Sequence, residues 1–118
     1  MVCGIHDSNA SLLPHLLGRA GPVSVVSTGT WVIAMSVGAT APALDPARDT
    51  LINVDAFGQP VPSARFMGGR EYQLMREGLT GAPTGAEREA VLRDGIMLLP
   101  AVVPESGPFA GRTHRWSR

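Results

Sequence analysis

The opening segment of the chain alternates between short apolar and polar blocks. Residues 2–5 are apolar and run into the polar cluster His6-Asp7-Ser8-Asn9, a pattern typical of a buried strand that ends at the N-terminus of a helix. The helix is predicted over residues 10–17, because leucines recur there on one face (Leu12, Leu13, Leu16, Leu17). Pro14 fits this helix only near its first turn, since proline has no N–H to donate further in.

Residues 23–27 and 31–37 form two arms rich in β-branched side chains, and Thr28-Gly29-Thr30 joins them. A glycine at such a join predicts a β-hairpin with a tight turn. Residues 38–49 are predicted to be a loop, because alanines, prolines and Asp45-Pro46 interrupt the pattern. A second strand pair is predicted over residues 51–57 and 63–67, joined by Gly58-Gln59-Pro60.

The second half of the chain predicts two helices. Residues 69–77 carry apolar side chains at helical spacing. A second helix is predicted over residues 86–93, opened by Thr84 and Glu87 at capping-box spacing. Residues 96–103 form a further apolar segment, and residues 104–118 form a tail rich in Pro, Gly, Arg and Ser. The order of elements predicts a mixed α/β (α+β) fold with an antiparallel component.

Composition narrows the class of protein. A chain of 118 residues holds one small core, and its hydrophobic fraction of 44% and charged fraction of 17% are those of a folded segment. A formal charge of zero argues against nucleic acid or an anionic membrane as the partner. Cys3 is the only cysteine, there is no visible signal peptide, and polar residues interrupt the longest apolar stretch, so a cytoplasmic protein without a transmembrane helix is expected.

The first candidate for chemistry is the segment that contains Asp7. A carboxylate between a strand and a helix faces exposed N–H groups and the positive end of the helix dipole. Such a group can take a proton from a substrate hydroxyl, as phosphoryl transfer to an alcohol requires. The alternative is that Asp7, Ser8 or Asn9 only caps the helix.

The second and third candidates are glycine turns. In Ser27-Thr28-Gly29-Thr30, glycine lets backbone N–H groups approach a phosphate and the hydroxyls add donors, although an ordinary hairpin turn uses the same residues. Gly68-Gly69, flanked by Arg65 and Arg70, could admit a ligand or form a strand-to-helix turn with Arg70 and Glu71 solvated. The histidines and Cys3 show no metal-ligand spacing, and Trp31 is interpreted as a core or half-buried residue.

The order and spacing of these motifs resemble a known family. Gly-Ile-His-Asp-Ser-Asn-Ala-Ser at residues 4–11, followed by Ser-Thr-Gly-Thr-Trp at residues 27–31, is similar to the start of the second domain of FGGY carbohydrate kinases. The similarity is greatest to the branch that contains rhamnulose- and fuculose-type kinases, and it covers about residues 2–110.

The resemblance implies a fold and a set of roles. The fold would be part of an actin-like, ribonuclease-H-like ATPase domain over residues 1–110, with residues 111–118 as an irregular tail. Asp7 would be the base that deprotonates a ketose hydroxyl, with His6 and Ser8 flanking the sugar and Gly69 on the substrate side. ATP, with its Mg²⁺, would meet the turn formed by Thr28, Gly29 and Thr30, and no protein-held metal is implied.

The resemblance also implies an incomplete cleft. The family's first domain and its later adenosine-binding segment have no counterpart in the sequence, so negligible kinase activity is expected from the chain alone, with the N-terminal kinase domain as a missing partner. A non-catalytic binding module and a decayed kinase remnant are the alternatives.

Overall fold

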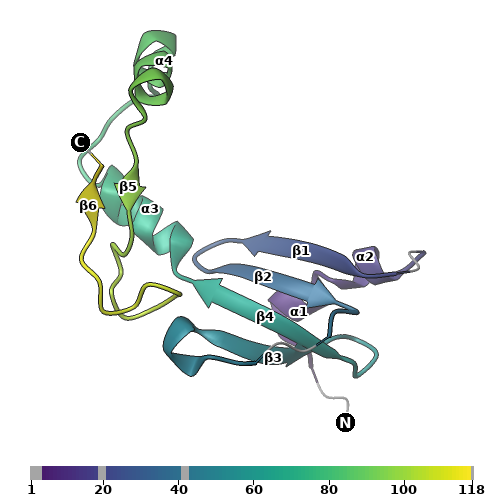
Figure 1. Ribbon diagram of the computed structural model, residues 1–118. Coiled ribbons are helices and arrows are strands. Elements are labelled where there is room, and N and C mark those ends of the chain that lie inside the picture. The colour runs from purple at the N-terminus through teal and green to yellow at the C-terminus, as the bar shows by residue number, and fades with distance from the viewer. Residues whose placement is uncertain (1–3, 19–20, 41–42, 118) are drawn as a thin grey trace.

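The computed structural model describes residues 4–18, 21–40 and 43–117 and is built around one antiparallel sheet (Figure 1). The sheet has four strands in the order β1-β2-β4-β3. Its strands are β1 (Val23–Thr28), β2 (Val32–Val37), β3 (Thr50–Val54) and β4 (Pro60–Phe66). A 3₁₀ turn, η1 (Pro46–Arg48), precedes β3. The mixed α/β prediction with an antiparallel component is confirmed.

The β1–β2 hairpin is confirmed close to its predicted bounds. Val25 pairs with Met35 and Thr28 pairs with Val32, which leaves residues 29–31 as the connection. β1 alternates strictly between half-buried and exposed positions, so one face of the hairpin points to the core.

The β3–β4 pair is also confirmed, but its turn lies earlier than predicted. β3 ends at Val54, and β4 already begins at Pro60, so Pro60 belongs to the strand. Asp55, which is buried, causes this: its Oδ1 accepts the backbone N–H groups of Phe57 and Gln59, each at 2.8 Å. An aspartate that binds its own following backbone in this way defines a turn.

The single N-terminal helix predicted over residues 10–17 is wrong. The structure has two one-turn helices instead, α1 (Asp7–Ala10) and α2 (Leu13–Leu16). Pro14 lies at the start of α2 and cannot donate to the carbonyl of Ala10, and a proline at such a position breaks or kinks a helix. Gly4 and Ile5 are not in a strand, and residues 1–3, with Cys3 and the rest of the predicted first strand, lie outside the described residues.

The core lies between these helices and one face of the sheet. Leu12, fully buried in the link between α1 and α2, packs with Ile33, Met35 and Val61 of the sheet. Burying these side chains contributes on the order of 1.5–3 kcal/mol each to stability, and it anchors α1 over the sheet.

Two longer helices follow the sheet. α3 (Gly68–Arg76) and α4 (Gly85–Asp94) begin one residue before their predicted starts. The capping box is confirmed: Thr84 Oγ1 accepts the Glu87 N–H, and the Glu87 carboxylate accepts the Thr84 N–H at 2.7 Å. α4 has no buried residue and projects away from the sheet (Figure 1). Within the described ranges, no helix has the length and apolar character needed to cross a membrane.

The tail is less irregular than predicted. β5 (Leu98–Leu99) pairs with β6 (Arg115–Trp116), so a short strand falls inside the 111–118 segment. The intervening loop is held by side chains of the main body: Glu71 Oε1 accepts the N–H groups of Val102 and Val103 at 3.0 and 3.1 Å. Glu71 is therefore not a solvated residue of the first helical turn.

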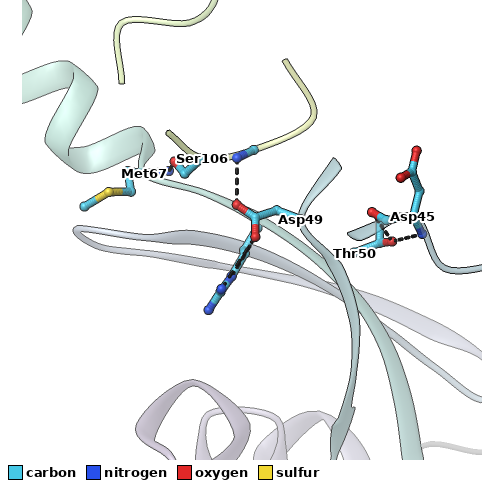
Figure 2. A network of polar contacts seen from close by, with 7 residues as sticks. Asp45, Asp49, Thr50, Met67 and Ser106 are labelled. Carbon is cyan, nitrogen blue, oxygen red and sulfur yellow. Dashed lines mark hydrogen bonds and ion pairs between the residues drawn. The ribbon is translucent and has the colours of Figure 1, made fainter. Parts of the chain in front are cut away.

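Asp49 makes a second attachment of this loop. Its Oδ2 accepts the Gly107 N–H at 2.8 Å, and the neighbouring Ser106 Oγ accepts the Met67 N–H at 3.2 Å (Figure 2). The C-terminal loop is thus tied to the start of β3 and to the β4–α3 junction.

Candidate functional site

A pocket of about 370 Å³ lies where the N-terminal segment meets the β1–β2 turn. Two stretches that are about twenty residues apart in the sequence supply its lining (His6, Asp7, Ser8 from one, and Ser27, Thr28, Gly29, Thr30, Trp31, Ile33 from the other). The core contact of Leu12 with the sheet brings the two stretches together, since it sets α1 against the same face. The structure thus unites the predicted carboxylate and the predicted phosphate turn in one pocket.

Asp7 is the first residue of α1, and 93% of its side chain is exposed. Its Oδ1 accepts the Ser8 backbone N–H at 2.7 Å and contacts Ser8 Oγ at 3.3 Å and His6 Nδ1 at 2.9 Å. These contacts fix the direction of the carboxylate without burying it. An exposed, oriented carboxylate of this kind can accept a proton from a bound alcohol.

His6 is the N-cap residue of α1, whereas the capping alternative had named Asp7, Ser8 or Asn9 for that position. Its Nδ1 lies 3.3 Å from the Ser8 amide nitrogen as well as 2.9 Å from Asp7 Oδ1. An Nδ1 that carries no hydrogen can accept the Ser8 N–H, whereas an Nδ1 that carries one can donate to the Asp7 carboxylate. The Ser8 N–H thus has two side-chain acceptors, Asp7 Oδ1 and His6 Nδ1.

The turn at residues 28–30 is exposed and faces the pocket. It combines the hydroxyl groups of Thr28 and Thr30 with the backbone of Gly29, which is a suitable set of donors for an anion. Helix α3 contacts the turn through a backbone hydrogen bond, in which the Arg70 N–H donates to the Thr30 carbonyl at 3.3 Å.

Gly69 lies against this turn and is not among the residues that line the pocket. A Cβ at position 69 would overlap the carbonyl group of Gly29 and crowd Thr30 Cα. Gly68 is similarly confined, by Val32 and the ring of Phe66. The placement of Gly69 on the sugar side stays a prediction, while its packing gives a physical reason for glycine there.

Trp31, predicted from the sequence to be a core or half-buried residue, packs against the core cluster and also lines the pocket. It is half-buried, and the Arg65 guanidinium lies over its ring, 4.8 Å from the centroid. Its position directly after the turn was the signal that could have placed it in the pocket.

No group of three or more His, Cys, Asp or Glu side chains able to hold a metal ion occurs within residues 4–18, 21–40 and 43–117. Among the described residues, the carboxyl group with a shifted pKa, that of Glu87, does not line the pocket. The Thr84 backbone N–H, followed by the Thr84 hydroxyl, lowers the pKa of Glu87 in the α4 capping box.

Comparison with known proteins gives a consistent result. A family model described as the C-terminal domain of carbohydrate kinase FGGY matches residues 20–118, a match that begins after the His6–Ser8 segment. A solved structure of a carbohydrate kinase from Novosphingobium aromaticivorans is 44% identical in sequence, with a TM-score of 0.78. No match was found among curated proteins.

The structural match covers 96% of this chain and 28% of the Novosphingobium chain, so this chain spans little more than a quarter of that protein's length. With the mixed α/β architecture, these matches are consistent with part of an actin-like, ribonuclease-H-like domain.

Proposed function

Because the chain belongs to the FGGY carbohydrate kinase family, as part of its C-terminal domain, we propose that its pocket is one side of a sugar kinase active site. The reaction is transfer of the ATP γ-phosphate to a hydroxyl group of a sugar. Following the motif similarity to rhamnulose- and fuculose-type kinases, we assign a ketose as the acceptor. The cytoplasm is the proposed location, because a single cysteine suits a reducing compartment.

Asp7 is the proposed base. Its recorded contacts all fall on Oδ1, so we assign Oδ2 to the substrate hydroxyl. As the hydroxyl oxygen bonds to the γ-phosphorus, its proton passes to Asp7, the bond from that phosphorus to the β–γ bridging oxygen breaks, and ADP leaves. His6 and Ser8 flank the sugar.

The phosphate side is assigned to the turn. Thr28, Gly29 and Thr30 line the pocket together with Asp7, and their hydroxyl and backbone donors suit the phosphate groups of ATP. Mg²⁺ enters with ATP as part of the substrate, and its role is to neutralise the phosphate charge. The observation that carries the proposal is this common pocket for the carboxylate and the turn.

The isolated chain is proposed to have negligible kinase activity. The pocket is formed by the start of one short helix and by one hairpin, whereas phosphoryl transfer needs positioning and charge stabilisation from several sides. The N-terminal kinase domain is the partner that we propose would complete the cleft.

A chimera tests the proposed chemistry. The matching segment of the Novosphingobium kinase would be replaced by this chain, and ADP release measured with a panel of ketoses. Asp7→Asn is expected to lower kcat by about 10²–10⁴-fold, the usual contribution of a general base. The matched control is Asp94→Asn, since that carboxylate lies on α4 beside Arg93 and does not line the pocket.

Two outcomes would contradict the proposal. Full activity of the Asp7→Asn chimera would show that Asp7 is not the base. An inactive chimera made with the unaltered chain, if the chain still binds MgATP, would instead support the binding-module alternative.

A further inference from the structure

Trp31 forms an aromatic wall of the pocket, next to groups that are otherwise mainly polar. The indole follows the turn directly and is half-buried. A wall of this kind shapes a site only if its ring is held in one orientation, because a free tryptophan rotates about two side-chain torsions.

Arg65 is placed to hold that ring. Across the sheet, Ser27 pairs with Ile33 and Ile33 pairs with Arg65, and directly paired residues point to the same face. Arg65 therefore projects from the face that carries the pocket-lining Ser27 and Ile33. Its guanidinium lies over the indole of Trp31, with 4.8 Å between the guanidinium carbon and the ring centroid.

Asp49 fixes Arg65 in turn. Asp49 Oδ1 lies 3.4 and 3.5 Å from Arg65 Nε and Nη2, and the Asp49 carbonyl accepts the Arg65 N–H at 3.2 Å. The other carboxylate oxygen accepts the Gly107 N–H, as Figure 2 shows for Asp49 at the centre of its network. A continuous set of contacts thus runs from the C-terminal loop through Asp49 and Arg65 to Trp31.

We propose that Arg65 is a positioning residue of the pocket, which fixes Trp31 as its wall and thereby sets the affinity for the phosphate-bearing ligand. The inference rests on the proposed function for the identity of that ligand. The orientation of Trp31 by Arg65 does not depend on the ligand, and Trp31 fluorescence measures it separately.

The test uses the chain with Trp116→Phe. The sequence has two tryptophans, so this substitution makes Trp31 the single source of tryptophan fluorescence. Arg65→Ala is expected to move Trp31 emission to longer wavelength, lower its anisotropy, and weaken MgADP binding by about 2- to 5-fold, the effect of losing one exposed cation–π contact. Arg65→Lys keeps a cation over the ring and is expected to restore most of both signals.

Arg76→Ala is the matched control. Arg76 also stacks on an aromatic ring, that of Tyr72 at 5.6 Å, but neither residue lines the pocket. Its loss is expected to leave Trp31 emission and MgADP affinity unchanged, and far-ultraviolet circular dichroism would verify that each variant is folded.

The outcomes separate the two proposals. Unchanged Trp31 emission in folded Arg65→Ala, or an equal change in Arg76→Ala, would overturn the positioning role. A specific emission change in Arg65→Ala, in a parent chain that does not bind MgADP, would support the placement of Trp31 and overturn the phosphate assignment. An emission change with unaltered MgADP affinity would refute the link between Trp31 and binding.

Discussion

At the scale of single residues, the pocket depends on close backbone approaches as much as on polar side chains. The turn that holds Thr28, Gly29 and Thr30 rests on the first residues of α3, where a side chain at position 69 would collide with the Gly29 carbonyl. The geometry of the proposed phosphate site is therefore set by a residue that does not line it.

Gly69→Ala tests this dependence. The added methyl group forces either α3 or the turn to move, and overpacking of this kind costs about 1–3 kcal/mol of unfolding free energy. Gly85→Ala is the control, because a Cβ there meets nothing within 4 Å. Urea denaturation is expected to show a lower midpoint for Gly69→Ala only; equal midpoints would show that the turn and α3 are not in rigid contact.

The same scale shows where sequence reasoning about the site succeeds and where it stops. The residue types of Asp7 and of the turn left helix capping and an ordinary hairpin turn open as alternatives. The resemblance to FGGY kinases singled out both segments, and the structure places them in one pocket. Sequence alone did not place Trp31 at the pocket, because an aromatic residue that follows a turn is equally suited to packing in a core. It also did not distinguish a glycine that contacts ligand from Gly69, whose confinement comes from a turn about forty residues earlier in the chain.

At the scale of elements, the predictions were reliable where local signals dominate. The hairpin, α3 and α4 were predicted nearly to their bounds, because β-branched runs, helical spacing and the Thr84–Glu87 pair are local. The prediction of one N-terminal helix was wrong because Pro14 interrupts it. Strand β6 was not predicted, because a two-residue strand exists only through its pairing with β5.

The α4 capping box makes a pH-dependent contribution that can be measured. The pKa of Glu87 is lowered from its ordinary value of 4.5, because the Thr84 N–H and then the Thr84 hydroxyl stabilise its charged form. A depressed folded-state pKa contributes stability above the unfolded value, and this contribution is lost as the pH falls through the folded value.

Amide hydrogen exchange in α4 would detect this contribution. Thr84→Ala is expected to reduce protection of the α4 amides about fivefold near neutral pH, the effect of losing an N-cap, and to flatten the dependence of protection on pH below 4.5. Glu89→Gln changes a carboxylate of the same helix outside the capping box and serves as the control. Unaltered protection in Thr84→Ala would mean that the box does not stabilise the helix in solution.

At the scale of the whole molecule, the chain exposes more surface than a compact protein of its mass. Its accessible surface is 8489 Å², whereas about 6,100 Å² is expected for a compact monomer of 12.4 kDa. Its radius of gyration of 17.4 Å likewise exceeds the value of about 13.5 Å for a compact domain of this length. The excess surface is larger than the roughly 800 Å² that each partner buries in a standard interface.

Part of that surface is apolar and lies on the sheet face opposite the α1 and α2 helices. Val26 of β1 and Ile52 and Val54 of β3 are 58%, 37% and 50% exposed, and the strand register places them on the same outer face. A sheet with apolar side chains on both faces is stable when both faces are covered. In a solution of the chain alone, a second copy is the available cover for this face.

The isolated chain is therefore expected to self-associate through the outer face of its sheet, in a concentration-dependent way that sedimentation velocity would measure. Replacing Val26 and Val54 together by lysine puts a charge on each edge strand and is expected to shift the chain to monomer. Leu92→Lys is the matched control, since that leucine is 81% exposed and belongs to α4, a helix that projects away from the sheet in Figure 1. If the unaltered chain stays monomeric at every concentration, or if Leu92→Lys dissociates it as well as the sheet variant does, then the outer face is not the surface that drives association.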